Sequence, residues 1–416
     1  MIQHYSDGGS ITGLLDLVRG LDHTRFRPVV SFRAANPFED ELRRAGAEVV
    51  VLGGAPTTDA PSAGTSPAGA VAPPPRPAAR WGARLARSTT RRELSRLIRR
   101  DVPHALHLRQ VVRDHDVALI HANNDVLSNR DAVIAAVLAR VPVVVHVRWI
   151  HHYRRDASLA IDKVLARRVS AFLAMSQAIA EGCRPLGIPT SRITVLDDPF
   201  DPSDYVVSPP PELGRVLGVP EGARVVVHIG RIVAWKGQDV FLRAMAEVVA
   251  RHPSAFALVV GGAGDGPDDG FGSRLEAIVG ELGITDRVAF TGPRRDVPEI
   301  LALSEVVVHS STDPEPFGRV VVEGMAAARA VVGADDGGVP EIIDAGVTGL
   351  LVGPRDPVAL SEAIDGLLAD PEATRLMGQR ARRSVVARFS LAGHAREVER
   401  TYTRALSRRG RRTLRS

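Results

Sequence analysis

Cysteine is almost absent from this chain of 416 residues, because Cys183 is the only one. The sequence therefore excludes an intramolecular disulfide and a metal site built from several cysteines. Long apolar runs are also lacking, since no stretch approaches the roughly 20 residues that span a bilayer. The first residues lack the basic start and apolar stretch of a signal peptide, so we expect a cytoplasmic protein.

Lysine and aromatic residues are scarce as well. Of the 53 Lys and Arg residues, only Lys163 and Lys236 are lysine. A retained lysine in such a chain indicates a place that needs a compact ammonium group rather than a planar guanidinium. The net charge of +5 would suit nucleic acid, but aromatic residues make up only 4% and leave little surface for stacking bases. We therefore expect no nucleic-acid partner.

Short apolar runs alternate with amphipathic stretches along most of the chain, first from Ile2 and again from Arg224. This alternation predicts two doubly wound α/β domains with parallel sheets. The expected strands are Ile2–His4, Val29–Phe32, Val49–Leu52, Val117–His121, Val143–Val147, Phe172–Met175, Arg224–Ile229, Ala257–Val260, Arg287–Phe290, Val306–His309, Ala330–Gly333 and Gly349–Val352.

Two proline-rich breaks divide the chain. The segment from Asp197 to Pro211 cannot hold a helix or a central strand, so we expect one domain over residues 1–198 and a second over residues 199–386. Residues 55–80 are rich in Ala, Pro, Gly, Ser and Thr and are expected to be a disordered insertion in the first domain.

A basic helix is expected after the insertion, with Leu94, Leu97 and Ile98 on one face. It is either a surface helix packed on the sheet or a helix that faces a membrane or an acceptor. The second alternative would put the protein at the inner face of the membrane through peripheral contact.

Glycines follow the first expected strand. In Asp7-Gly8-Gly9-Ser10 they would let a phosphate or a sugar approach the start of a helix, although a Gly-Gly pair alone is weak evidence. The strand Ile2–His4 is shorter than a usual central strand, so we expect that the coding sequence starts further upstream.

The second domain carries more specific features. Its first strand, Arg224–Ile229, runs into Gly230-Arg231, and Lys236-Gly237 follows just before a helix expected from Asp239 to Ala250. Two positive charges beside the free amides of a helix start suit a diphosphate. Surface cations in an ordinary loop are the plainer alternative, which the scarcity of lysine disfavours.

Two glutamates are spaced by eight residues around a second helix start. Glu315 lies on a loop, and Glu323 is expected inside a helix that begins near Phe317 or Gly318. A carboxylate inside such a helix can accept hydrogen bonds from ribose hydroxyls, and one on the loop can accept them from a sugar. Capping and surface charge are the alternative. A further glycine turn, Gly337–Glu341, is expected to lead into another helix.

These motifs together resemble the family 4 retaining glycosyltransferases. The resemblance rests on Gly230-Arg231…Lys236-Gly237, on Glu315-Pro316-Phe317-Gly318…Glu323 and on Gly337-Gly338-Val339-Pro340-Glu341. It covers nearly the whole chain and is strongest after Ala223. It implies two facing Rossmann-like domains, the GT-B type, with the active site in the cleft between them. Residues 387–416 resemble the segment that crosses back to the first domain as a helix.

The resemblance also implies roles for individual residues. Arg231 and Lys236 would neutralise the donor diphosphate, and Glu323 would hold the ribose. Glu315, with the backbone of Phe317 and Gly318, would hold the donor sugar. The implied donor site also includes Gly9, Gly230 and Arg319. No metal or other cofactor is implied, because the two cations would take the place of a metal.

Two departures from the family pattern are visible. Arg148 stands where the family often has a histidine after the fifth strand, with His146 before it and His151 and His152 just beyond. We treat these four as candidate contacts for the sugar or the acceptor. In the linker, Asp198-Pro199 replaces a frequent Asn-Gly, which leaves the role of Asp198 open.

The sequence thus predicts transfer of a hexose from a nucleoside-diphosphate sugar to a hydroxyl group, with retention of anomeric configuration. An epimerase or hydrolase of sugar nucleotides, or a protein that binds them without catalysis, remains an alternative. A dinucleotide oxidoreductase is disfavoured because no Gly-x-Gly-x-x-Gly opens the first helix. The acceptor, whether a saccharide, a lipid-linked sugar or a small metabolite, is left open, as are the donor base and sugar, the linkage and the oligomeric state.

Overall fold

The computed structural model describes residues 2–3, 9–52, 91–150, 157–263 and 270–413. The expected insertion at residues 55–80 lies outside these ranges, as do Asp7, Gly8, His151 and His152. The chain divides into two compact units. The first unit comprises residues 1–175, 179–196 and 392–416, and the second comprises residues 176–178 and 197–391.

The first unit is built on a parallel sheet with the strand order β3-β2-β1-β4-β5-β6-β7. The strand Ile193–Val195 was not predicted, and the others lie within three residues of their predicted bounds. The strands are β1 (Ile2–Gln3), β2 (Val29–Phe32), β3 (Glu48–Val51), β4 (Ile120–Asn123), β5 (Val143–Val147), β6 (Ala171–Ala174) and β7 (Ile193–Val195).

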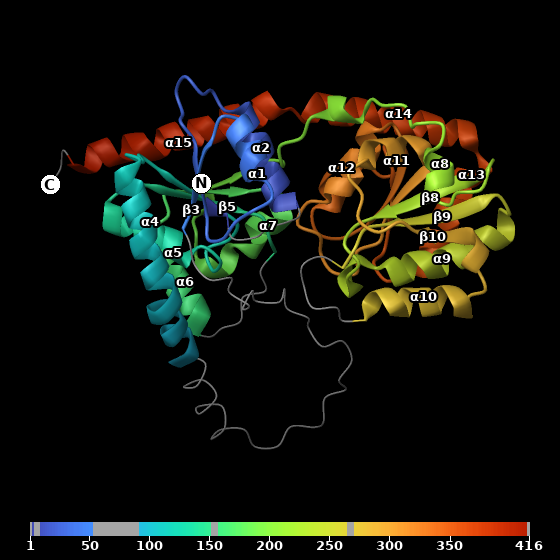
Figure 1. The fold of residues 1–416 in the computed structure, drawn as a ribbon, viewed down its shortest axis with the longest axis horizontal. Helices are drawn as coiled ribbons and strands as arrows, with labels where there is room; N and C mark the ends of the chain where they lie inside the picture. The colour runs from blue at the N-terminus through green and yellow to red at the C-terminus, as the bar shows by residue number, and fades with distance from the viewer. Residues whose placement is uncertain (1, 4–8, 53–90, 151–156, 264–269, 414–416) are drawn as a thin grey trace, which may run out of the picture. The chain divides into compact units, whose positions relative to one another are not determined.

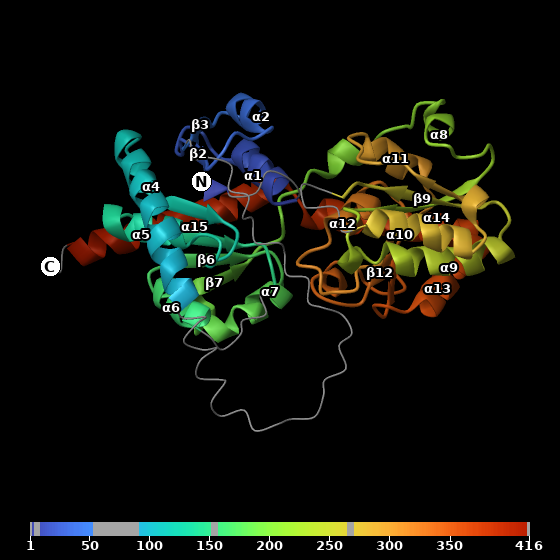
Figure 2. The same ribbon diagram turned by 60° about the horizontal axis from the view of Figure 1, so that its bottom comes forward.

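Helices cover both faces of this sheet (Figure 1). On one face α4, α5 and α6 lie together, and Figure 2 shows α4 running alongside α5. On the other face α15 packs against α1 and the central strands. The helices are α1 (Gly9–Gly20), α2 (Glu39–Arg44), α4 (Val102–Asp114), α5 (Arg130–Ala139), α6 (Ala157–Ala166), α7 (Gln177–Gly182), whose first two residues belong to the second unit, and α15 (Leu391–Thr413).

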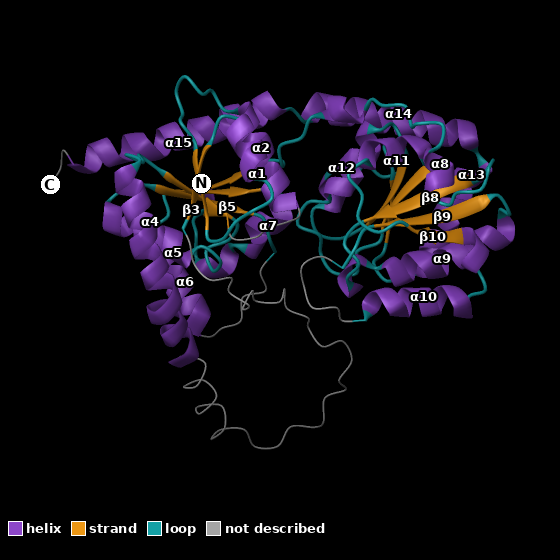
Figure 3. Cartoon of the chain, in the orientation of Figure 1, coloured by secondary structure: helices purple, strands orange, loops and turns teal. Residues whose placement is uncertain are grey.

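The second unit has a six-stranded parallel sheet in the order β10-β9-β8-β11-β12-β13, seen as the second group of orange strands in Figure 3. Its apolar core lies between the sheet and the helices α9, α10 and α13. The strands are β8 (Arg224–Ile229), β9 (Ala255–Val260), β10 (Val288–Phe290), β11 (Val306–His309), β12 (Ala330–Ala334) and β13 (Leu350–Val352). The helices are α8 (Leu213–Val216), α9 (Gln238–Arg251), α10 (Phe271–Glu281), α11 (Val297–Leu303), α12 (Arg319–Ala326), α13 (Pro357–Ala369) and α14 (Pro371–Arg388).

One prediction about the second unit is wrong. The helix expected after the turn Gly337–Glu341 is not an α-helix, because only a single 3-10 turn, Val339–Glu341, forms there. The chain turns back at once, with the amide of Thr348 donating to the carbonyl of Asp344, and Gly346 has a φ of +77°. The reversal at Gly346, which the sequence pattern alone did not reveal, leaves no room for a longer helix between Glu341 and β13.

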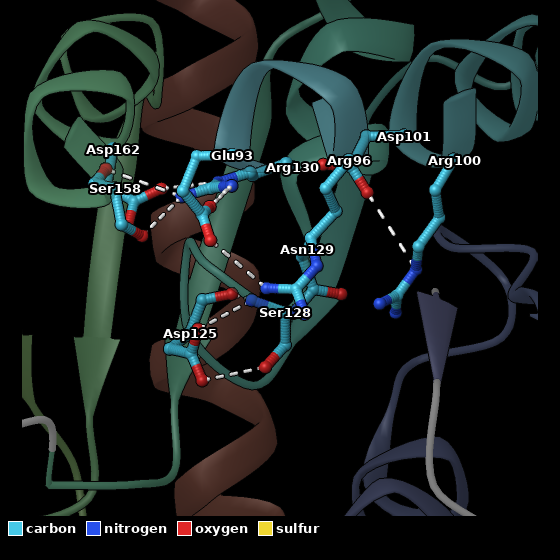
Figure 4. A network of polar contacts seen from close by, with 10 residues as sticks. All are labelled: Glu93, Arg96, Arg100, Asp101, Asp125, Ser128, Asn129, Arg130, Ser158 and Asp162. Carbon is cyan, nitrogen blue, oxygen red and sulfur yellow. Dashed lines mark hydrogen bonds and ion pairs between the residues drawn. The ribbon is translucent and has the colours of Figure 1, made fainter. Parts of the chain in front are cut away.

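A buried ionic network fixes the basic helix of the first unit (Figure 4). Residues 91–96 are helical and continue through a π turn, Leu97–Asp101, into α4. The fully buried Arg130 donates from Nε to Asp162 Oδ1 (2.7 Å), from Nη1 to Glu93 Oε2 (2.9 Å) and from Nη2 to Ser158 Oγ (2.7 Å). Because a buried guanidinium is costly unless it is fully paired, this geometry ties the basic helix to α5 and α6.

The Leu94 and Ile98 side chains of this helix point into solvent, with exposed fractions of 50% and 58%. The burial of Asp101, with the charge of Asp131 close by, raises the pKa of Asp101 to about 6. Thus the inner face of the helix is polar and paired, and its outer face is partly apolar.

Buried histidines line the contact between the first sheet and α15. His121 Nδ1 lies 2.6 Å from the Tyr402 hydroxyl, and the rings of His146 and His394 stack with centroids 6.0 Å apart. Burial, and the nearby positive charge of Arg148, hold the pKa values of His121 and His146 well below the usual range. Both rings are therefore neutral in the folded protein.

The neutral histidines predict acid sensitivity of the first unit. A histidine whose pKa is lower in the folded than in the unfolded state contributes stability above about pH 6.5 and loses it as the pH falls, by about 1.4 kcal/mol per pH unit. When the pH falls from 6.5 to 5, we expect the free energy of unfolding of His146→Phe to decrease by about 2 kcal/mol less than that of the wild type. Urea unfolding at both pH values measures this, and equal losses in the two proteins would contradict it.

Candidate active site

The order of the second sheet defines where a ligand should bind. From β8 successive strands are added on one side of the sheet as far as β10, and from β11 they are added on the other side, so the carboxyl ends of the neighbouring parallel strands β8 and β11 form the switch point of the sheet. In open α/β sheets, ligands bind beyond the carboxyl ends of the strands at such a point. The candidate active site is therefore the edge formed after Ile229 and His309.

The loop after β8 brings a lysine to this edge. It passes Gly230 and Arg231, forms a 3-10 turn over Ala234–Lys236 and enters α9 at Gly237. Gly237 has a φ of +68°, and a Cβ there would lie 2.0 Å from the carbonyl oxygen of Ser310. Only glycine fits this position, so the loop after β8 can lie directly against the loop after β11.

Lys236 and Glu315 form an ion pair at the centre of the site. The Lys236 Nζ lies 2.6 Å from Glu315 Oε2 and 4.3 Å from the centre of the Trp235 ring, and the two side chains are only 15% and 13% exposed. Burial alone would raise the pKa of Glu315, but the Lys236 charge and a bond from His309 outweigh it and hold that pKa below its usual range. Glu315 is therefore a carboxylate at all ordinary pH values.

Two further side chains reach the same carboxylate, and sequence reasoning missed both. His309 Nε2 lies 3.3 Å from Glu315 Oε2, and the Ser311 hydroxyl donates to the same oxygen at 3.0 Å. The ring of His228 lies at the end of β8, where burial and the neighbouring His309 lower its pKa to about 3. Polar residues at the ends of otherwise valine-rich strands were the signal that could have revealed them.

The glycine turn after β12 supports the loop that carries Glu315. The Gly338 amide donates to the Glu315 carbonyl at 2.8 Å. Gly337 has a φ of +63°, and a Cβ there would lie 2.2 Å from that carbonyl oxygen. The second and third motifs of the sequence thus meet backbone to backbone.

Glu323 belongs to a separate polar cluster at the start of α12. Its Oε1 lies 3.2 Å from the Nε of Arg319, and Asp198 Oδ2 lies 3.8 Å from Arg319 Nη1. Burial and the charge of Glu323 raise the pKa of Tyr205, whose hydroxyl bonds to that carboxylate. Asp198, whose role the sequence left open, is buried beside Arg319.

The remaining predicted residues of the second unit differ in their surroundings. Arg231 is exposed, while its carbonyl accepts a bond from Gln238 Nε2 at 2.7 Å. Phe317 is buried with its ring edge-on to that of Phe389, so its side chain is part of the core. Gly318 caps α12 with a φ of +97°. Thus Lys236 and Glu315 are brought into contact, while Glu323 and Arg319 pair with each other.

The first unit has its own switch point between β1 and β4, and polar residues gather at the carboxyl ends of β4 and the neighbouring β5. Arg148 Nε donates to Asn123 Oδ1 at 2.6 Å. Asn124 has a φ of +137°, and its buried Nδ2 has no hydrogen-bond partner among the residues described. Backbone strain and an unpaired buried amide at a switch point are features of ligand sites.

The other predicted residues of the first unit are placed as follows. Gly9 begins α1. His146 is wholly buried in the core below α15, so in this conformation its ring reaches neighbouring side chains rather than a ligand. His151 and His152 lie outside the described residues.

The described residues hold no group of three or more His, Cys, Asp or Glu side chains able to bind a metal ion. Over the same ranges, no helix is long and apolar enough to cross a membrane. Cys183 is buried, and burial together with the charge of Asp125 raises the pKa of its thiol to about 12. A thiol with so high a pKa is unreactive at neutral pH.

Comparison with known proteins relates both units to glycosyltransferases. Residues 211–384 match the family model of glycosyl transferases group 1, and residues 33–198 match that of the glycosyl transferase 4-like domain. Similar proteins include D-inositol 3-phosphate glycosyltransferase of Corynebacterium jeikeium, 34% identical over 45% of each chain. Another is N-acetyl-alpha-D-glucosaminyl L-malate synthase of Bacillus anthracis, 32% identical over 52% of this chain and 55% of that protein. These alignments span about half the length of the curated relatives.

Solved structures resemble the chain over almost its whole length. Anabaena Alr3699/HepE in complex with UDP-glucose is 27% identical, covers 97% of this chain and 98% of its own, and gives a TM-score of 0.77. Sucrose-phosphate synthase from Thermosynechococcus elongatus shares the fold with a TM-score of 0.73 at 20% identity, covering 98% of this chain and 96% of its own. The predicted fold class is confirmed, since two Rossmann-like units with parallel sheets make up the GT-B fold.

The ion pair in the site predicts a specific loss of stability. Lys236→Met would leave Glu315 as a largely buried, poorly compensated charge, and we expect the free energy of unfolding to fall by about 3 kcal/mol. Adding Glu315→Gln should recover most of this loss. The matched control is Lys163→Met, because Lys163 is the other lysine and is exposed on α6. Urea unfolding measures the free energy of unfolding of the wild type, the two single variants and the double variant. If Lys236→Met is as stable as Lys163→Met, the buried ion pair between Lys236 and Glu315 is contradicted.

Proposed function

Because the chain belongs to the group 1 glycosyltransferase family, we propose that it transfers a hexose from a nucleoside-diphosphate sugar to an acceptor hydroxyl. The observation that carries this proposal is the Lys236–Glu315 pair at the switch point of the second sheet. It combines a cation suited to the diphosphate with a carboxylate suited to sugar hydroxyls. The HepE structures with bound UDP and UDP-glucose support a donor of this class.

The proposed roles follow from charge. When the bond between sugar C1 and the diphosphate oxygen breaks, negative charge grows on the leaving diphosphate. Lys236 and Arg231 would stabilise that charge, which lowers the barrier to bond breaking. Glu315 and the backbone of Phe317 and Gly318 would hold the sugar, and Glu323 the ribose. Gly9, Gly230 and Arg319 complete the proposed donor site.

We propose retention of configuration at C1. Two relatives bear names that contain an alpha-linked sugar, namely the N-acetyl-alpha-D-glucosaminyl L-malate synthase and an alpha-D-kanosaminyltransferase of Streptomyces kanamyceticus. Common donors such as UDP-glucose also carry their sugar in the α configuration, so α products mean retention. Epimerisation or hydrolysis of the donor is the less favoured alternative, because the names of these relatives describe synthesis and transfer.

The proposed reaction needs no metal ion. Lys236 is held in place by Glu315 and the Trp235 ring before any ligand arrives, so a fixed positive charge is available where a metal would otherwise act. For the acceptor, we propose the carboxyl edge of the first sheet, where Asn124 and Arg148 lie. Its polar and cationic groups suit a hydroxylated acceptor.

We further propose peripheral contact between the basic helix and an anionic membrane at the cytoplasmic face. On this helix the side chain of Leu94 is half exposed and that of Ile98 more than half. The same helix also exposes Arg91, Arg92 and Arg99. Apolar side chains beside arginines suit insertion between negatively charged lipid headgroups. The Arg130–Glu93 bond supports this proposal, since it keeps the inner face of the helix turned to the protein.

The scarcity of lysine gives a sharp test of donor binding. An amine-acylating reagent can modify the side chains of Lys163 and Lys236 alone, and the proposal predicts that UDP-glucose protects Lys236 while Lys163 reacts at an unchanged rate. The same protein should release UDP in the presence of EDTA and a hydroxyl acceptor, and Lys236→Ala should lower kcat/KM by at least about a hundredfold.

Mass spectrometry measures the acylation of each lysine, and NMR of the product determines the anomeric configuration of the transferred sugar. A panel of UDP-, GDP-, ADP- and TDP-sugars extends the test to other donors. If no donor in the panel protects Lys236 or yields a nucleoside diphosphate, the proposal is wrong. A β-linked product would refute retention only, and sugar release without transfer to any acceptor would favour hydrolysis.

Membrane contact has its own expected outcome. The full chain should sediment with vesicles containing phosphatidylglycerol but not with pure phosphatidylcholine vesicles. Replacing Leu94 and Ile98 by serine should weaken that binding about tenfold, as should replacing Arg91 and Arg92 by glutamine. Val358→Ser is the control, because Val358 is at least as exposed as Leu94 and Ile98 but lies in the second unit. If these variants bind the vesicles as strongly as the wild type, the basic helix is not the membrane contact.

A further inference from the structure

We propose that His309 and Ser311 are positioning residues that fix the Glu315 carboxylate so that only its Oε1 oxygen is presented to the donor sugar. The inference rests on the proposed function, because it concerns the carboxylate that would bind the sugar. It adds two residues whose part in the site depends on hydrogen bonds rather than on contact with a ligand.

Three donors converge on a single oxygen of Glu315. Lys236 Nζ, Ser311 Oγ and His309 Nε2 lie 2.6, 3.0 and 3.3 Å from Oε2. No hydrogen bond from the described residues reaches Oε1. A carboxylate whose one oxygen is saturated in this way cannot exchange its two oxygens by rotation without breaking all three bonds. Oε1 therefore keeps its lone pairs for an incoming hydroxyl.

The bonding pattern also sets the tautomer of His309. A carboxylate only accepts, so the hydrogen must lie on Nε2, and the Ser311 hydroxyl 3.1 Å away can accept from the same N–H while donating its own proton to Glu315. The Nδ1 of His309 is then a bare acceptor, and it is buried with no hydrogen-bond partner among the residues described. The three groups thus form one closed arrangement around Oε2.

The backbone explains why these two residues act together. His309 is the last residue of β11, and residues two apart along an extended chain point to the same side. Ser310, between them, points the other way and donates to the carbonyl of Gly237 at 2.8 Å. The loop after β11 therefore fastens to the start of α9 on one side and to Glu315 on the other.

The burial of His309 and Ser311 argues that these polar side chains have a specific role. Both His309 and Ser311 are at least 97% buried, and a polar group in such a place costs stability unless its bonds are made. The rest of β11 is valine, which would pack at this depth without that cost. The polar pair is thus explained by what it does to the carboxylate.

The experiment separates the sugar from the nucleotide. Calorimetry would measure the affinities of the full chain for UDP and for UDP-glucose. His309→Leu and Ser311→Ala should each weaken UDP-glucose binding about tenfold, the size of one charge-assisted hydrogen bond, and leave UDP binding unchanged. His309→Gln and Ser311→Thr restore a donor near the lost atom and should recover binding to within about threefold.

Two variants control for effects of packing. His252→Leu breaks a similar histidine–carboxylate contact with Asp365 (2.8 Å), and Ser361→Ala removes another buried hydroxyl, both away from the site. These variants should bind both ligands as the wild type does. Thermal unfolding shows whether each variant is folded. If a His309 variant is not folded, the comparison of Ser311→Ala with Ser311→Thr decides the test.

The outcomes distinguish the inference from the proposed function. If the wild type binds neither UDP nor UDP-glucose nor any other donor of the panel, the proposed function fails and the inference fails with it. If the wild type binds them but the variants lose affinity for UDP and UDP-glucose in equal measure, only the inference is overturned. The same holds if His309→Gln and Ser311→Thr recover nothing.

Discussion

The site depends on one ion pair, that between Lys236 and Glu315. Neither charge would be tolerated so far from water alone, and each makes the burial of the other acceptable. The loops around them are arranged to bring the two together. A glycine without room for a Cβ begins α9, and a second glycine lets the turn after β12 press against the backbone of Glu315. Three segments that are distant in the sequence thus converge on one contact.

The first unit also buries a charged side chain, with different residues to compensate it. Arg130 is fully buried and is held by two carboxylates and a serine from two helical segments, while the histidines under α15 stay neutral. In both units a buried charged side chain is therefore compensated by hydrogen bonds with neighbouring polar groups. Asn124 differs, since its backbone is strained and its buried Nδ2 has no hydrogen-bond partner among the described residues.

Much of the fold could be predicted from the sequence because buried parallel strands are nearly pure apolar runs. β2, β5, β8 and β11 have the bounds that were expected. The pattern failed where polar residues enter a strand, as at Asn123, the last residue of β4, and at Thr194, the middle residue of the missed strand β7. The motifs located the Lys236 and Glu315 loops, but not their contact. His309 escaped notice because its meaning comes from a partner that only the folded backbone brings near.

The division of the chain has a consequence for its synthesis. The first unit takes its last helix from residues 392–416, and until α15 arrives the apolar side chains of Leu17, Val144 and Leu173 lack the helix that packs against them. The ribosome makes the whole of the second unit in between. At about 5–20 residues per second, roughly 10–40 seconds pass before the C-terminal segment follows. The unit whose synthesis begins first is therefore completed last, and during that interval the apolar surface that α15 covers is open to contact with other chains.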